Sequence, residues 1–385
     1  MSPVEVSPVR SRSDRTAFLR FPWKVYANDP AWVPPLLVER AAFIDPKRHP
    51  FYLHGSAALF LARRDGEVVG RIIASDDPRY NAQHGANAGC FGMFESADDP
   101  VVAHALLDTA AAWVASRGRT EILGPIDYST NYVMGLLIDG FQFPPTVWTP
   151  HNPPFYQRLL ESWELTKATD LFAWRFSEMK EIPERWQKLR ERIMQRTSVR
   201  IRPLAMGDFD KEVHRAKKIW NDAWERNWGS VAATDAEFEA LARNLKLVIL
   251  PQYVLIAEVD GEPVGFILCV PDLNVALRRL NGRLTTFGIP IGLAKLLYYK
   301  SRINSGRVIA LGVLEKYRRR GVAEMLVLHL MEEGTVKRDA VVELSQTLED
   351  NHLINHFLES LGATIYKRYR IYRKALTPQP ATGLA

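Results

Sequence analysis

The sequence predicts an α/β fold in which helices cover mixed sheets, arranged as two related domains in tandem. Segments with the pattern of strands alternate with segments with the pattern of helices in both halves of the chain. The pattern A-x-x-D-G-E-x-V-G occurs at residues 62–70 and again at 257–265, and L-E-S occurs at 160–162 and 358–360. Two markers that recur at nearly the same offset indicate that one structural unit is repeated.

In the first half, the Asp-Gly pair of the repeated pattern predicts a tight hairpin between two strands. Helices are expected at about 100–116 and 153–162. Asp98 or Asp99 can cap the first of these helices, and Pro100 suits its first turn because its ring already fixes a helical φ. The first half therefore predicts strand, helix, strand and helix in that order.

The second half repeats this order and ends with a further strand. Asp260 and Gly261 mark its hairpin turn, and Gly362 ends its last helix. Strands are expected at 253–259, 262–270, 308–311, 340–345 and 366–373, and helices at 324–333 and 353–361. A basic turn joins the third strand of this half to its first helix.

The basic turn has the pattern R-x-x-G-x-A, at Arg318, Gly321 and Ala323. The first amides of a helix have no partner within the helix, and they lie at the positive end of its dipole. Together with arginine side chains they attract phosphate oxygens. The sequence contains neither G-x-x-x-x-G-K-[ST] nor G-x-G-x-x-G after a strand. We therefore expect a pyrophosphate site here, and the alternative is an ordinary connection with a solvated arginine run.

This turn and the elements around it resemble the acyl-CoA-binding part of the GNAT superfamily, the GCN5-related N-acyltransferases, over about residues 198–375. The resemblance implies an N-acyltransferase with acyl-CoA as the acyl donor and no metal. The chain departs from the family at Leu358, seven residues after Asn351, where many members place a tyrosine as general acid. The cofactor-binding residues that the resemblance implies are Leu311, Val313, Arg318, Arg319, Arg320, Gly321, Val322, Ala323 and Asn351.

The repeat also predicts domain boundaries. We expect a flexible N-terminal tail over residues 1–16, a degenerate GNAT-like domain over 17–178, a GNAT acyltransferase domain over 179–375 and a flexible C-terminal tail over 376–385. The first domain has two aspartates where the second has its arginine turn, and their carboxylates would repel a pyrophosphate. Only the second domain is therefore expected to bind CoA, while the first is structural or forms a wall of the acceptor site.

A basic and apolar insert, residues 273–305, interrupts the second domain. It holds six arginine and lysine residues and no acidic residue among leucine, isoleucine and tyrosine. This composition is typical of an element that places apolar side chains in a lipid surface and cations on anionic headgroups. We expect contact with an anionic membrane surface, and the alternative is a helical lid with a solvated basic rim.

Composition and the N-terminal sequence indicate the cellular compartment of the protein. The chain of 385 residues has a net charge of +6, and it contains no run of 18 apolar residues that could span a bilayer. Its N-terminus lacks the apolar core of a signal peptide. Cys90 and Cys269 show no metal-binding spacing and indicate a reducing compartment. We expect a cytoplasmic protein, peripheral on the inner membrane, with no nucleic-acid partner.

Three tryptophans within nine residues predict an apolar pocket for the acceptor amine, because indole rings are seldom exposed. Core packing is the alternative for at least two of them. For the base that deprotonates the amine we favour Glu349, with Glu343 as the second candidate and Tyr369 as a proton donor. The predicted substrate-binding residues are Trp220, Asn221, Trp224, Asn227 and Trp228.

Three functions fit these patterns. The first is acyl-CoA-dependent N-acylation of a hydrophobic or lipid amine at the membrane surface. The resemblance to bacterial GNAT-type enzymes that acylate lipid amines implies an acceptor such as a sphingoid long-chain base. The second is N-acetylation of a small polar amine or a protein, with the insert as a lid. The third is non-catalytic acyl-CoA binding, which the missing tyrosine leaves open. We expect the first.

Overall fold

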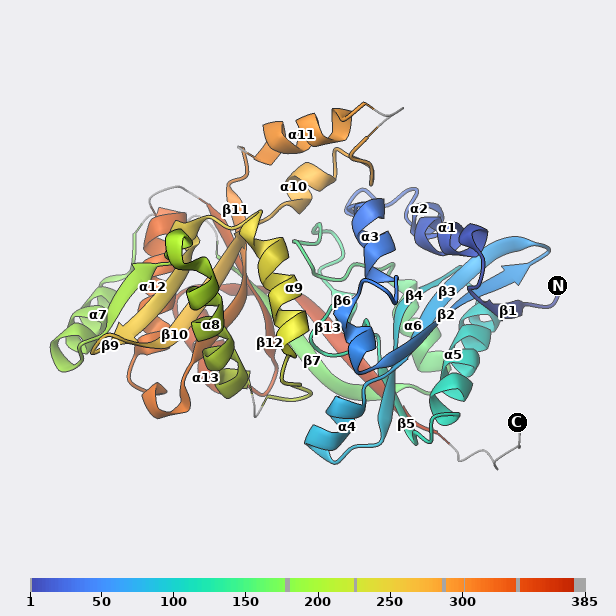
Figure 1. Cartoon of the computed structure of the whole chain (residues 1–385), viewed down its shortest axis with the longest axis horizontal. Helices are drawn as coiled ribbons and strands as arrows, with labels where there is room; N and C mark the ends of the chain where they lie inside the picture. The colour runs from blue at the N-terminus through green and yellow to red at the C-terminus, as the bar shows by residue number, and fades with distance from the viewer. Residues whose placement is uncertain are drawn as a thin grey trace. The chain divides into compact units, whose positions relative to one another are not determined.

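The computed structural model describes residues 2–176, 181–224, 227–285, 289–300, 302–336 and 340–376, and it is a mixed α/β structure (Figure 1). The predicted fold class is confirmed, because helices and strands alternate along both halves. The predicted C-terminal tail lies outside the described residues except for Leu376.

The chain divides into two compact units, and each draws on more than one segment. Unit 1 comprises Met1–Leu171, Leu277–Lys295 and Lys367–Ala385, and unit 2 comprises Phe172–Ala276 and Leu296–Tyr366. The predicted division at residue 178 follows the sequence repeat, whereas these units follow the packing.

In unit 1 the strand order is β1-β2-β3-β4-β5-β13, and β6 also pairs with β13. The strands are β1 (Glu5–Pro8), β2 (Ser56–Arg64), β3 (Glu67–Asp76), β4 (Ala88–Ser96), β5 (Glu121–Gly124), β6 (Leu136–Asp139) and β13 (Thr364–Ala375), of which the part from Lys367 belongs to this unit. The helices are α1 (Arg12–Arg20), α2 (Pro22–Val25), α3 (Leu37–Phe43), η1 (Pro50–Leu53), α4 (Pro78–His84), α5 (Pro100–Ala115) and α6 (Phe155–Ser162).

The first sixteen residues differ from the flexible tail that we expected. β1 pairs antiparallel with β2, and α1 begins at Arg12. Ser11 and Asp14 form a capping box, in which the Ser11 hydroxyl accepts from the Asp14 amide at 3.0 Å and the Asp14 carboxylate accepts from the Ser11 amide at 3.1 Å. This reciprocal cap satisfies two amides at the helix end and fixes where the helix begins.

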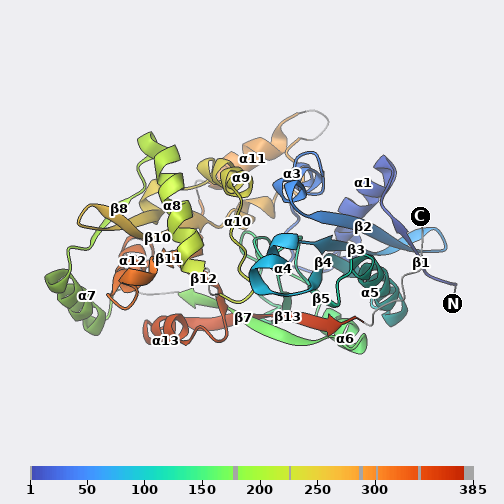
Figure 2. The same ribbon diagram turned by 60° about the horizontal axis from the view of Figure 1, so that its bottom comes forward.

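In unit 2 the strand order is β7-β12-β11-β10-β9-β8. The strands are β7 (Thr166–Phe176), of which the part from Phe172 belongs to this unit, β8 (Arg200–Pro203), β9 (Val254–Val259), β10 (Glu262–Pro271), β11 (Ser305–Val313) and β12 (Val341–Leu348). The helices are α7 (Glu184–Arg196), η2 (Met206–Asp208), α8 (Phe209–Trp224), α9 (Asp235–Lys246), η3 (Pro251–Tyr253), η4 (Glu315–Tyr317), α12 (Val322–Met331), η5 (Glu332–Val336) and α13 (His352–Ser360). Figure 2 shows α7 next to α12. The insert contributes α10 (Asn274–Leu277) and α11 (Ile291–Lys300), and of these helices the residues from Leu277 to Lys295 belong to unit 1.

The two faces of the unit 2 sheet carry different helices. Along β9 and β10, alternate side chains point to opposite faces. Ile256 and Phe266 pack with α8, whereas Leu255 and Ile267 belong to the core that contains Leu326 of α12. α8 and α12 therefore cover opposite faces of this sheet.

The two units share one topology. Hairpins β2–β3 and β9–β10 both turn on an Asp-Gly pair with positive φ at both residues, as the repeat predicts. In unit 1, β4 pairs in parallel with β5 and is followed by α5, and in unit 2, β11 pairs in parallel with β12 and is followed by α12. The predicted tandem arrangement is confirmed.

Candidate active site

The central strands of unit 2 separate where the site is expected. β11 pairs with β12 only from Ser305 to Val308, although β11 continues to Val313 and β12 continues to Leu348. Backbone groups of the last residues of β11 on the β12 side therefore have no ladder partner from β12. Leu311 is half-buried and Val313 is buried in this stretch. Free backbone groups beside two diverging strands can bond an extended ligand in place of a strand.

The basic turn leads directly from this strand into α12. Arg319 has φ of 63° and Gly321 has φ of 81°, so the chain is left-handed at both positions. A side chain at Gly321 would be strained by this φ, and an ideal Cβ there would lie 2.3 Å from Cδ1 of Ile193 on α7. Gly321 is the N-cap of α12, and no side chain caps the helix. The first amides of α12 are therefore available to an anion.

The three arginines of the turn have different surroundings. The Arg318 guanidinium donates to the carbonyl oxygens of Asp222 at 3.1 Å and Ala223 at 3.2 Å, in the last turn of α8, and also to Val313 O at 3.3 Å. These bonds hold the turn to α8, so Arg318 has a clear structural role. The Arg319 and Arg320 side chains are exposed, and Arg320 lies over the Tyr317 ring at 5.3 Å.

The corresponding place in unit 1 is closed by its own residues. β4 stops pairing with β5 after Cys90, and the segment that follows β5 continues alongside β4 in the same direction. There the Ile126 amide donates to Phe91 O at 2.7 Å, and the Met93 amide donates to Asp127 Oδ1 at 2.9 Å. A Cβ on Gly92 would lie 2.3 Å from the Ile126 carbonyl oxygen, so the fit is tight.

The helix that follows in unit 1 is capped by a carboxylate. Asp99 is the N-cap of α5 and accepts from the Val101 amide at 2.8 Å, while Arg64 donates to its other oxygen at 2.7 Å. Burial raises the pKa of Asp99, but these hydrogen bonds outweigh it and hold the pKa below its usual range. The place that an anion would take at α5 is therefore filled by a negative charge.

The structure brings two of the predicted tryptophans together on α8. The rings of Trp220 and Trp224 stack with centroids 4.4 Å apart and an interplanar angle of 19°. Trp224 covers Gly312 of β11, where an ideal Cβ would lie 2.7 Å from Cζ3 of the indole. The stacked pair packs against a core cluster that contains Ile219 and Phe266. It therefore contributes to core packing and also covers the end of β11.

The remaining predicted acceptor residues lie at or just beyond the end of α8. Oδ1 of Asn221 is buried and has no hydrogen-bond partner among the described residues. A buried acceptor of this kind is uncommon and can take a donor from a ligand. Asn227 is half-buried, and its amide donates to Trp224 O at 2.9 Å. Trp228 is half-buried as well.

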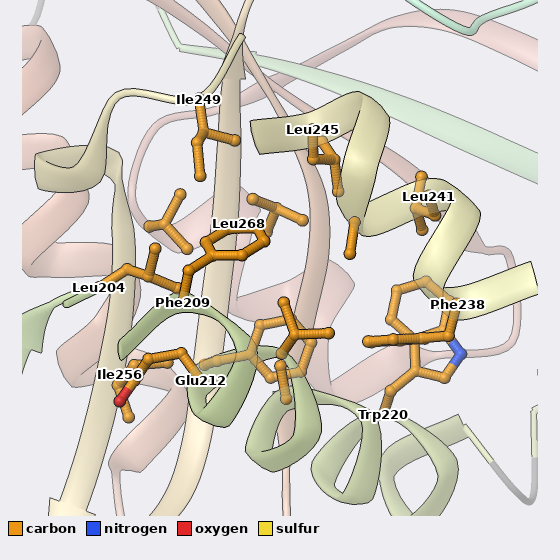
Figure 3. Close-up of a pocket in the computed structure, with 15 residues that line it drawn as sticks. Leu204, Phe209, Glu212, Trp220, Phe238, Leu241, Leu245, Ile249, Ile256 and Leu268 are labelled. Atoms are coloured by element: carbon orange, nitrogen blue, oxygen red, sulfur yellow. The ribbon is translucent and has the colours of Figure 1, made fainter. Parts of the chain in front are cut away.

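An apolar pocket lies between α8, α9 and the sheet, with Trp220 at one end (Figure 3). Its volume is about 60 Å³, and its surface is entirely apolar. The carboxylate of Glu212 is held by Arg202 at 3.0 Å and Arg215 at 2.7 Å, so only the stem of this side chain contributes to the lining. The other lining residues are Leu204, Phe209, Val213, Ala216, Phe238, Leu241, Ala242, Leu245, Ile249, Val254, Ile256, Phe266 and Leu268.

This pocket is the part of the site that sequence reasoning missed. Only Trp220 was predicted, because its neighbours come from five separate segments. The apolar spacing of Phe238, Leu241, Ala242 and Leu245 on α9 is an amphipathic signal that identifies a buried helix face, but it does not show that a cavity lies beneath that face.

Glu343, the second candidate for the base, lies in a buried polar network. It is 3% exposed, its Oε1 is 3.7 Å from Nε of Arg307, and Ser345 and Tyr366 both donate to it. Arg307 is directly opposite Glu343 in the β11–β12 pairing and also donates to the Ser345 hydroxyl at 2.8 Å. These contacts indicate that Glu343 has a structural role, in which its carboxylate links β12 to β11.

Glu349, the favoured base, is half-buried just beyond β12. It lines a second pocket of unit 2, with a volume of about 420 Å³, together with His352 and His356 of α13. Asn351 is the N-cap of α13, but its side chain makes no capping hydrogen bond. Tyr369, the predicted proton donor, lies in unit 1, where it is fully buried on β13. The described residues contain no group of His, Cys, Asp and Glu that could hold a metal ion.

These features define the class of the protein. A parallel strand pair that separates, a glycine turn without a cap and a following helix form the second half of a tandem α/β fold. The model of the acetyltransferase (GNAT) family matches residues 213–363. The chain belongs to the GNAT family and is an acyltransferase.

The curated relatives extend over nearly the whole chain. A bacterial ceramide synthase from Caulobacter vibrioides (strain NA1000 / CB15N) is 37% identical over 383 residues, which are 97% of this chain and 98% of that protein. Protein YghO from Escherichia coli (strain K12) is 36% identical over 375 residues, 95% of this chain and 94% of that protein.

Solved structures support the fold. A tandem GNAT protein from the clavulanic acid biosynthesis pathway has a TM-score of 0.57 at 13% identity, over 98% of this chain and all of that chain. A GCN5-related N-acetyltransferase from Sphaerobacter thermophilus has a TM-score of 0.51 at 14% identity, over 99% of this chain and 98% of that chain. No described helix is long and apolar enough to cross a membrane.

Proposed function

We propose that the chain transfers the acyl group of an acyl-CoA thioester to the amine of a hydrophobic or lipid substrate, such as a sphingoid long-chain base. We propose that it works in the cytoplasm, peripherally on an anionic inner membrane surface. The single observation that carries CoA binding is the N-terminus of α12, which follows a separated strand and has no side-chain cap.

The amides of Gly321, Val322 and Ala323 would hold the pyrophosphate, because they are the first amides of the helix. The exposed side chains of Arg319 and Arg320 would add charge. Leu311 and Val313 would bond the extended part of the cofactor through their backbones, and Asn351 would contact it from the N-terminus of α13. Arg318 would support the site by holding the turn to α8.

In the reaction, the amine must lose a proton before it attacks the thioester carbon. We propose Glu349 as the group that accepts this proton, directly or through water. The new C–N bond forms as the C–S bond breaks, and CoA leaves as a thiolate that takes a proton. A backbone amide near Leu311 to Val313 would stabilise the charge on the thioester oxygen.

Two observations support a lipid acceptor. The relative from Caulobacter vibrioides is called a ceramide synthase, and its match extends over both halves of this chain. α11 exposes Ile291, Leu293, Leu297 and Tyr298, which are 42 to 61% accessible, beside the basic residues of the insert. Apolar and cationic groups on one short helix suit an anionic lipid surface.

The test compares Ala323→Asp with Ala323→Asn by calorimetry with CoA. An aspartate in the first helical turn favours the helix, so the fold should persist. A carboxylate about 5 Å from a phosphate opposes it by about 3 kcal/mol at an effective dielectric constant of about 20, which weakens CoA binding by more than roughly 100-fold. The uncharged isostere should keep most of the affinity. Equal affinity in both variants would place CoA elsewhere.

A second measurement addresses the acceptor. Mass spectrometry of reactions with acyl-CoA and a panel of amines should show N-acylated long-chain amines ahead of small polar amines. Preferential acylation of a polyamine or a peptide would instead assign the chain as an acetyltransferase of polar amines.

A further inference from the structure

We infer that the apolar pocket between α8, α9 and the sheet binds the hydrocarbon tail of the amine substrate, with its mouth at residues 245–250 turned toward the membrane that supplies this substrate. The inference rests on the proposed acyl transfer and deepens it by assigning a tail site.

The lining of the pocket selects hydrocarbon. None of its surface is polar, and the one carboxylate among its residues, that of Glu212, is bound by two arginines. Apolar cavities of this kind stay dry and accept apolar guests. At about 10–15 Å³ for each water-sized group, 60 Å³ holds about four to six such groups. That is enough for part of one alkyl chain, and the rest of a long chain must leave through the mouth.

The inner end of the pocket points to the acceptor rather than the donor. Trp220 closes this end and stacks on Trp224, which covers Gly312 between Leu311 and Val313. The stacked pair therefore lies between the pocket and the strand where we place the thioester. The pocket is on the α8 face of the sheet, whereas α12 lies on the opposite face. A chain in this pocket would approach the thioester from the face away from α12, past the two tryptophans.

We place the mouth of the pocket at residues 245–250 because this segment has the character of a lipid-facing surface. Leu245 and Ile249 line the pocket, while Leu247 is 76% exposed and Leu250 is 36% exposed in the same segment. Lys300 at the end of α11 donates to Leu247 O at 3.2 Å, so the helix ends beside this segment.

The end of α11 continues this surface. Leu297 and Tyr298 are 61% and 53% exposed, and the Arg302 guanidinium lies 4.2 Å from the centre of the Tyr298 ring. Exposed apolar side chains with cations beside them complement an anionic bilayer surface, which is where a lipid amine resides.

The first test fills the pocket. Ala242→Phe places a ring among the lining residues, and Ala240→Phe on the same helix is the matched control because Ala240 is not part of the lining. Rates are measured for linear alkylamines of increasing length with acetyl-CoA held fixed. Each methylene that the pocket buries should raise kcat/KM of the wild type about fourfold. Ala242→Phe should abolish this dependence, and Ala240→Phe should retain it.

A second variant gives the opposite change, so a folding defect cannot imitate the result. Leu245→Ala enlarges the pocket near its mouth and should move the preferred amine to a longer chain. Dodecylamine should also raise the melting temperature of the wild type without any acyl donor, because a ligand that binds only the folded state stabilises it, and Ala242→Phe should lose this shift.

A parallel experiment measures rates for acyl-CoA donors of increasing chain length with a short amine held fixed. If Ala242→Phe removes a dependence on donor length but leaves the dependence on amine length, the pocket belongs to the acyl chain and the inference is overturned. If no amine is acylated while CoA binding still responds to Ala323→Asp, the proposed acyl transfer is rejected. The tail site is then judged by the shift in melting temperature with dodecylamine alone, so failure of the tail site and failure of the proposed function give different results.

The mouth is tested with vesicles of phosphatidylglycerol and phosphatidylethanolamine that contain hexadecylamine. The double variant Leu247→Glu, Leu250→Glu should acylate this amine at least tenfold more slowly than the wild type, and its loss of rate with butylamine in solution should be smaller. Leu53→Glu on η1, where the leucine is 75% exposed, is the control. Equal rates of the double variant and the control with vesicles would overturn the assignment of the mouth.

Discussion

Replacement of Glu343 by glutamine should destabilise the protein more than it slows the chemistry. The Glu343 carboxylate is 3% exposed and lies 3.7 Å from the guanidinium of Arg307, which is itself 7% exposed. A buried cation that loses its anionic partner costs several kcal/mol. Because Arg307 keeps its hydrogen bond to Ser345, we take about 3 kcal/mol, at the lower end of the range for such pairs.

This loss of free energy of unfolding corresponds to a measurable drop in melting temperature. A domain of about 150–250 residues loses roughly 2–4 °C of melting temperature for each kcal/mol, so Glu343→Gln should melt about 6–12 °C lower. Calorimetry gives this shift, and the acyl-transfer rate per folded molecule gives the chemistry. Glu343→Leu combined with Arg307→Met should recover most of the stability, because two apolar side chains replace the ion pair without leaving a charge. A melting temperature within a degree of the wild type, together with a large loss of kcat in Glu343→Gln, would refute the structural role and make Glu343 the base.

Three further predictions concern other parts of the molecule. Glu349→Gln should remove the acidic limb of the pH–rate profile, and an unshifted limb would show that another group accepts the proton. In unit 1 the folded pKa of Asp99 is lowered, so its stabilising effect is complete above about pH 4 and is lost as the pH falls through the folded pKa; Asp99→Asn should flatten that part of the acid unfolding curve. Leu297→Asp on α11 should weaken a salt-sensitive binding to anionic vesicles, because charge attraction is screened beyond about 8 Å at physiological ionic strength. Wild-type protein that ignores such vesicles at low salt would contradict the membrane proposal.

Local signals explain which parts of the fold could be predicted. The Asp-Gly hairpins and the strand–turn–helix at Gly321 depend on neighbours in the sequence, and both have the expected form. The capping box at Ser11 is equally local, but the polar composition of the N-terminus suggested a tail instead.

Long-range contacts explain what could not be predicted. Arg318 was expected to bind phosphate, and nothing in the sequence indicates its hydrogen bonds to carbonyl groups almost a hundred residues earlier in the chain. Glu343 meets Arg307 only because of the register between β11 and β12, which the sequence does not specify. Tyr369 is predicted as a proton donor, and its place in unit 1 with the end of β13 follows from packing that the sequence does not show.

The comparison of the two units explains how one topology can have an open helix N-terminus in one half and a filled one in the other. In both, a parallel pair separates after a few residues and a helix follows the inner strand. In unit 1 the chain itself occupies the gap through Ile126 and Asp127, and Asp99 supplies the charge at the helix end. In unit 2 a glycine stands at the helix cap, and no side chain replaces that charge. A site built from backbone groups needs no particular side chain to bind a phosphate, but one carboxylate or one adjoining segment of chain is enough to fill it. Giving unit 1 a CoA site would therefore require removal of both the Asp99 cap and the segment along β4, and either change alone should leave that unit unable to bind.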